Sequence, residues 1–202
     1  MKIGILVLCL SAFVCNAHRL EQSETEPADK ITPIGNVELH IIDNTSTTVP
    51  VLNQAVQLIK EIFATAGVHV EWGNGGSRIS KIAFDRRVIV DITDVTPWNY
   101  FEGALGYSRP YEGVHVTVLY DRVHQAAPDA VLRSLLLAHV LVHEITHVLQ
   151  GVEHHSESGI MKAHWGPADY YAMAVKPLPF TVEDILLLKM GMRFKPVQEE
   201  PF

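Results

Sequence analysis

An apolar run from Val131 to Leu149 contains the motif H-E-x-x-H, as His143, Glu144 and His147, and it constrains this chain more than any other feature. A run of this length and composition predicts a buried helix. Residues four apart on a helix lie on one face, about 6 Å apart along its axis, so both imidazoles can reach one metal ion. Glu144 lies one step around the helix, where a carboxylate can accept a proton from an activated water.

Three features around the motif support a metal site. Polar side chains in an otherwise apolar helix would cost about 1–3 kcal/mol each if nothing there used them. Gly151 predicts the end of the helix, because a left-handed residue can turn the chain back toward the motif. His154 and His155 follow that turn, and the sequence S-G-I-M follows them at 158–161.

The stretch resembles the metzincin clan of zinc metallopeptidases, whose signature is H-E-x-x-H-x-x-G-x-x-H followed by a turn with a methionine beneath the zinc. The resemblance implies a Zn²⁺ cofactor with His143 and His147 as ligands, Glu144 as the catalytic base and Met161 as the Met-turn residue. The spacing departs from the signature. Gly151 comes four residues after the second ligand instead of three, and the two later histidines come at seven and eight instead of six.

The third ligand is therefore not fixed by register. His155 is preferred, because the last histidine of the clan is often followed by a small residue and Ser156 follows here. His154 is the alternative, and Glu153 is a weaker one. A glutamate from a later helix, as in thermolysin-like peptidases, would be Glu183, but the Met-turn argues against that arrangement.

Residues 1–17 predict a secretory signal peptide. Lys2 precedes an apolar core at 3–14, a small-residue ending reaches Ala17, and the apolar run is too short to span a bilayer. We expect cleavage near Ala17 and therefore a secreted or periplasmic protein. The polar residues 18–36 predict a flexible leader or a short propeptide.

Composition limits the mature protein in two ways. Both cysteines, Cys9 and Cys15, lie in the signal peptide, so neither a disulfide nor latency through a cysteine thiolate on the zinc is available. Without Lys2, 15 Lys and Arg stand against 23 Asp and Glu, a net charge of −8. This balance argues against nucleic acid or an anionic membrane as a partner. We expect a monomer.

Residues 37–195 predict one catalytic domain, followed by a tail at 196–202. Alternating apolar residues predict strands, and apolar residues at helical spacing predict helices. The predicted strands are 37–42, 68–72, 88–92 and 114–123. The predicted helices are 50–66, 128–149 and 181–190, and the segments 93–113 and 163–179 are expected to be irregular.

The resemblance implies an α+β fold of the zincin type. Its parts would be a twisted mixed β-sheet, two long helices, the Met-turn and a small C-terminal subdomain with one helix. Residues 104–108 or the run after them would supply an edge strand that holds a peptide or protein substrate in extended form.

These expectations describe a secreted zinc-dependent metalloendopeptidase. Two other functions stay open at this stage. One is a zinc hydrolase that acts on a non-protein amide or a cell-wall peptide. The other is a secreted zinc-binding module without catalytic activity.

Overall fold

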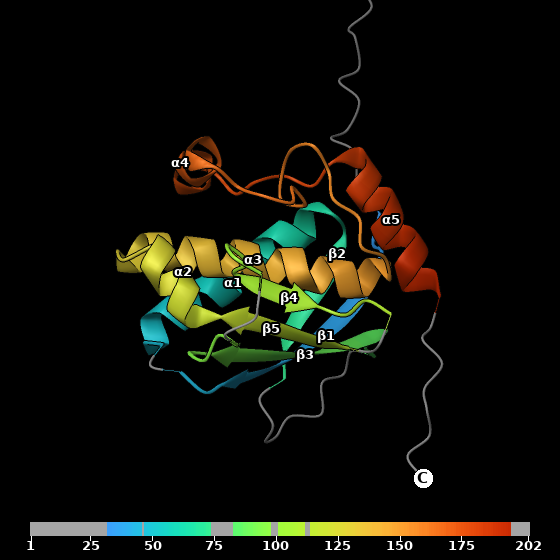
Figure 1. Cartoon of the computed structure of the whole chain (residues 1–202). Coiled ribbons are helices and arrows are strands. Elements are labelled where there is room, and N and C mark those ends of the chain that lie inside the picture. Colours follow the sequence, from blue (N-terminus) through green and yellow to red (C-terminus); the bar gives the residue numbers. More distant parts are fainter. Residues whose placement is uncertain (1–31, 46, 74–82, 98–100, 112–113, 195–202) are drawn as a thin grey trace, which may run out of the picture. The chain divides into compact units, whose positions relative to one another are not determined.

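The computed structural model of this chain describes residues 32–45, 47–73, 83–97, 101–111 and 114–194. The predicted signal peptide, residues 18–31 of the predicted leader and the tail lie outside these residues. The described part has a mixed α/β fold with five strands and five helices (Figure 1). Its sheet is mostly parallel.

The five described strands form one sheet in the order β2-β1-β3-β5-β4. Four of them run parallel, and the fifth pairs antiparallel with its neighbour at one edge. The parallel strands are β1 (Gly35–Asp43), β2 (Val68–Trp72), β3 (Arg86–Thr93) and β5 (His115–Leu119). The antiparallel edge strand is β4 (Gly106–Ser108), within the region where an edge strand was expected.

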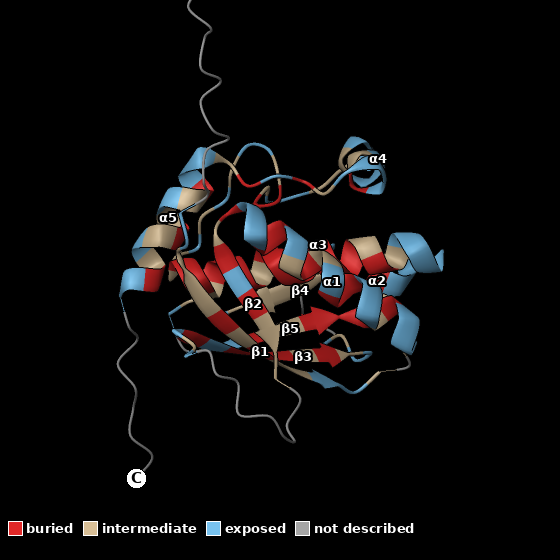
Figure 2. Ribbon diagram, turned by 180° about the vertical axis from the view of Figure 1, so that it is seen from behind, coloured by how far each residue is buried: buried red, intermediate tan, exposed pale blue. Residues whose placement is uncertain are grey.

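Two long helices cover one face of this sheet: α1 (Val49–Thr65) and α3 (Ala130–Gln150). The core lies between them and the sheet, and Figure 2 shows the buried residues gathered on α3 and along the strands. α1 ends where the sequence predicts, at the turn before Gly67, whose φ is +79°. α3 is also long and apolar enough to cross a membrane, but most of it is buried in this core.

The ends of α3 follow from its sequence. The side chain of Asp129 accepts hydrogen bonds from the backbone N–H groups of Val131 and Leu132, which have no partner within the helix. At the other end Gly151 adopts a φ of +71°, a left-handed conformation that glycine reaches without strain. The helix therefore ends one residue beyond the apolar stretch, and the chain then turns back at Gly151.

The prediction of a strand at 114–123 is confirmed for its first half and wrong for its second half. β5 ends at Leu119, and the helix α2 (Tyr120–Ala126) begins at the next residue. Tyr120, Val123 and Ala127 are all buried, so the apolar spacing changes from two to three and four residues at this point. The last four residues of the predicted strand therefore belong to a helix.

The expectation of one helix after α3 is also wrong, because the structure has two: α4 (Pro167–Val175) and α5 (Val182–Arg193). α4 lies in the segment that was expected to be irregular. Pro167 suits its first turn, and Asp169 accepts hydrogen bonds from the backbone N–H of Gly166 and from Lys162 Nζ. Local capping thus forms a short helix whose apolar periodicity is too brief to recognise.

α5 packs closely against the C-terminal end of α3 at Gly191. A Cβ atom there would lie 2.7 Å from Gln150 Cα and closer still to the Leu149 carbonyl oxygen. The carbonyl oxygens of Gly191 and Phe194 accept hydrogen bonds from the buried Arg86 guanidinium. α5 is therefore held against both α3 and the sheet.

We expect Gly191→Ala to destabilise the protein by about 1–3 kcal/mol, because the added methyl group forces two backbones apart. Met190→Ala, at an exposed position on the same helix, is the matched control. The measurement is the urea-unfolding midpoint of the two variants. Equal midpoints would contradict the close approach of α5 to α3.

Candidate metal centre

α3 places His143 and His147 one turn apart, and both are buried. His143 Nδ1 lies 2.9 Å from the Ile160 carbonyl oxygen, and His147 Nδ1 lies 3.2 Å from the Val152 carbonyl oxygen. A carbonyl oxygen can only accept, so both Nδ1 atoms carry the proton and donate. Each Nε2 atom is left with an unshared electron pair.

These two Nε2 atoms face each other at 3.1 Å. Two acceptors at this distance repel unless a cation lies between them and their neighbours. Zinc holds nitrogen at about 2.0–2.1 Å, which places two nitrogens of a tetrahedral site about 3.3 Å apart. The pair therefore has the geometry and the tautomers of two zinc ligands.

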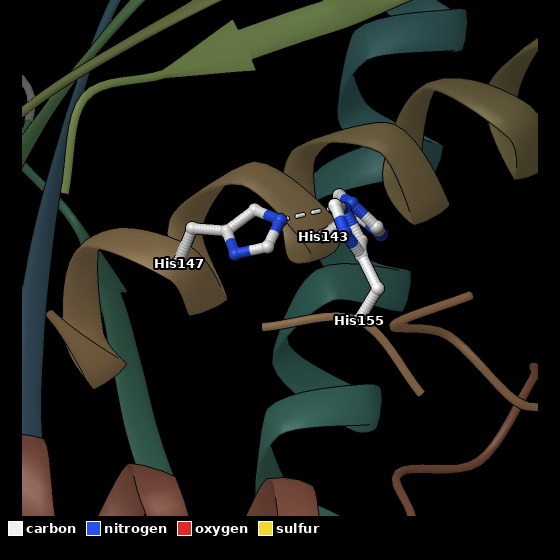
Figure 3. A group of neighbouring side chains, drawn as sticks. All are labelled: His143, His147 and His155. Atoms are coloured by element: carbon white, nitrogen blue, oxygen red, sulfur yellow. Dashed lines mark hydrogen bonds between the residues drawn. The ribbon is translucent and has the colours of Figure 1, made fainter. Parts of the chain in front are cut away.

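His155 completes the cluster from the loop after α3. Its ring centroid lies 5.3 Å from that of His143 and 4.9 Å from that of His147. One nitrogen from each of the three rings lies within 4.8 Å of the other two, and Figure 3 shows the rings converging. These three histidines could hold a metal ion.

His154 points elsewhere. Its Nε2 atom lies 3.5 Å from Ser156 Oγ, 3.9 Å from Glu183 Oε2 and 4.0 Å from Asp184 Oδ1. Glu153 is exposed, and its backbone N–H is directed at the Tyr111 hydroxyl. Of the four candidates for the third ligand, the structure brings only His155 to the histidine pair.

The loop that carries His155 is anchored on α5. Ser156 Oγ donates a hydrogen bond of 2.7 Å to Asp184 Oδ1, and Asp184 is fully buried. Its other oxygen accepts from the Thr181 backbone N–H at the start of the helix. The Ser156 backbone N–H donates to the Met161 carbonyl oxygen at 2.8 Å. The residue after His155 is thus fixed on two sides.

Two residues of the segment 160–165, Ile160 and Trp165, contact His143. Ile160 supplies the carbonyl that orients His143, and the side chain of Met161 is fully buried. Trp165 meets His143 edge to face, with ring centroids 5.5 Å apart. His143 is therefore held by a hydrogen bond on one nitrogen and by aromatic contact on its ring.

His139 lies one turn before His143 and could be mistaken for a ligand. Its Nδ1 atom donates to the Leu135 carbonyl oxygen at 2.7 Å, and its Nε2 atom accepts from the Leu178 backbone N–H at 3.1 Å. Both nitrogens are used by the backbone and the side chain is fully buried. His139 is a core histidine that ties residue 178 to α3.

Glu144 is half-buried and faces β4. Its Oε2 atom accepts a hydrogen bond of 2.8 Å from Ser108 Oγ. Burial raises the pKa of Glu144 to about 7, while the Ser108 hydrogen bond acts in the opposite direction. Such a carboxyl can exchange a proton near neutral pH.

Burial has the opposite effect on the two helix histidines. It lowers the pKa of His143 to about 4 and that of His147 to about 3. Both imidazoles are therefore neutral near pH 7, and neutral imidazole is the form that binds a metal.

Sequence reasoning missed two residues of this site, Ser108 and Asp184. Ser108 is 36 residues from the glutamate that it contacts, and Asp184 is 28 residues from Ser156. No local signal could have linked these residues to the histidines.

The chain matches no protein-family model and no curated protein. Its structure is similar to the crystal structure of archaemetzincin from Methanopyrus kandleri. That alignment covers 83% of this chain and 99% of that chain, with a TM-score of 0.51 and 17% sequence identity. At this identity the similarity establishes a common fold. The mixed α/β fold of this chain, with its five-stranded, mostly parallel sheet, is therefore similar to the fold of archaemetzincin.

We expect His155→Ala to lower zinc affinity by more than the roughly 10–100-fold that loss of an outer hydrogen-bond partner costs. His154→Ala is the matched control, since His154 lies outside the cluster, and it should change the affinity about tenfold or less. Competition with a chromogenic chelator measures both dissociation constants. The reverse ranking would assign the third position to His154.

We expect the metal-free protein to lose stability as the pH falls from 6.5 toward 4.5. Burial lowers the pKa of four histidines, so the unfolded chain takes up protons in this range that the folded chain does not; they are His139, His143, His147 and His155. The raised pKa of Glu144 acts in the opposite direction, but it is one group against four. Urea midpoints across the range measure the effect, and a midpoint that rises toward acid pH would contradict it.

Proposed function

We propose that this protein is a secreted zinc-dependent metalloendopeptidase of the metzincin type. The observation that carries the proposal is the convergence of three imidazoles, two of them from the H-E-x-x-H helix, beside a half-buried glutamate. The archaemetzincin-like fold supports it, because the name of that neighbour places it among the metzincins.

His143, His147 and His155 would hold Zn²⁺. The neutral form of the two helix histidines, with Nδ1 donating to carbonyls and Nε2 free, fits this role. Bound zinc would supply Lewis-acid activation of a water molecule and of the peptide carbonyl.

Glu144 would act as the general base. Its carboxylate would take a proton from the attacking water and pass it to the leaving amine nitrogen. Its half-buried position supports this role, because a carboxyl whose pKa lies near 7 can both accept and return a proton at neutral pH.

Met161 would be the methionine of the Met-turn. It is fully buried next to Ile160, whose carbonyl orients His143, and its own carbonyl accepts from Ser156. In this role residues 160–161 would support His143 directly and His155 through its neighbour Ser156.

The substrate would be a peptide or protein bound in extended form along β4. This strand lies at one end of the described sheet and crosses α3 at Glu144. An extended peptide added there would run past the base as one more strand. We further propose that the signal peptide at 1–17 directs export and that the protein acts outside the cytoplasm. It would act as a monomer, without nucleic acid or membrane partners.

Glu144→Gln should abolish cleavage of unfolded casein and leave zinc near one per chain, because an amide cannot act as a base but keeps the shape of the side chain. Zinc content and casein cleavage are measured side by side for the wild type and the variant. Glu153→Gln, an exposed glutamate near the loop of His155, is the matched control and should cleave like the wild type.

Two results would overturn the proposal. Cleavage by Glu144→Gln at the wild-type rate would exclude this residue as the base. Zinc bound by the wild type without cleavage of casein or of cell-wall peptides would leave a zinc-binding module without catalytic activity.

A further inference from the structure

We infer that Ser108 is a positioning residue for Glu144, and that β4 holds the base in place as well as offering its edge to a substrate. This inference rests on the proposed function. It concerns a contact between a strand and a helix that are 36 residues apart in the sequence.

The register of β4 directs Ser108 toward α3. Ser108 pairs with Val116 and Gly106 pairs with Val118, and both valines are buried on the helix-covered face. Tyr107 pairs with Thr117 and belongs to the opposite face. Ser108 Oγ thereby reaches Glu144 Oε2 at 2.8 Å.

Gly106 makes this approach possible. A Cβ atom at Gly106 would lie 3.0 Å from Val140 Cγ1 and 3.2 Å from Glu144 Cγ. The backbone of β4 therefore rests directly on α3 at Glu144 and one turn before it. The absence of a side chain at Gly106 leaves room for the stem of Glu144, and Ser108 donates a hydrogen bond to its carboxylate.

The close backbone of β4 and the hydrogen bond from Ser108 restrict the side chain of Glu144. A glutamate side chain loses conformational entropy when it is fixed, and the contacts with β4 impose this loss before a substrate arrives. With Oε2 accepting from Ser108, the second carboxylate oxygen is left to accept the proton of the attacking water. Fixing a reacting group in this way increases rate without adding binding contacts.

The same strand would carry the substrate. A peptide that pairs with the outer edge of β4 would be placed in register with the residues whose inner face holds the base. Ser108 therefore connects the position of the scissile bond to the position of Glu144.

The first experiment compares Ser108→Ala with Ser108→Thr on the zinc-loaded full chain. Ser108→Ala should lower kcat about 10–100-fold and leave KM and zinc affinity unchanged, because the base is present but no longer held. Ser108→Thr keeps the hydroxyl group and should recover most of that loss. Thr117→Val, which removes a hydroxyl group from the opposite face of the neighbouring strand, should behave as the wild type.

The second experiment uses the metal-free protein and needs no activity. Ser108→Ala should lower the melting temperature in the presence of Glu144, because a half-buried carboxylate loses its donor. In a Glu144→Ala background the same change should have little effect. Equal shifts in both backgrounds would show that the two side chains are not coupled.

The outcomes separate the two proposals. A wild-type protein that cleaves nothing overturns the proposed function and with it any catalytic role of Ser108. A wild-type protein that cleaves, together with Ser108→Ala at the same kcat, overturns the inference alone. A loss in kcat that Ser108→Thr does not recover would also overturn it, because the hydroxyl group would not be the cause.

Discussion

The site depends on how the buried histidines of α3 use their nitrogens. His143 and His147 each donate Nδ1–H to a backbone carbonyl that lies beyond the helix, and this leaves two Nε2 electron pairs 3.1 Å apart. An apolar environment keeps both rings neutral. The carbonyls belong to Val152 and Ile160, so the loop and the turn after α3 must fold back correctly before the two rings can act together.

Two other parts of the chain act on this centre from opposite sides. α5 fixes the residue after His155 through the buried Asp184, and β4 fixes Glu144 through Ser108. α5 is itself held by its close contact at Gly191 and by Arg86 at the end of the sheet. The loop of His155 and the proposed base are therefore held by separate elements, α5 for the loop and β4 for Glu144.

Most regular elements could be predicted from local periodicity. The first three predicted strands and all three predicted helices are present near their predicted positions, because each buries a regular apolar face. The errors occur where the period is short or changes. Strand becomes helix at Tyr120, and α4 is built mainly by capping at Gly166 and Asp169, which single-sequence patterns register weakly.

The sequence by itself determined the helix, the pair His143 and His147 with Glu144 beside them, and the end of the helix at Gly151. All of these follow from spacing along one element. The choice between His154 and His155 was decided only by tertiary structure, because neighbouring residues on a loop point in different directions. Asp184, from a helix almost thirty residues away, accepts a hydrogen bond from Ser156 and so fixes the loop position next to His155, the ring that lies at the pair.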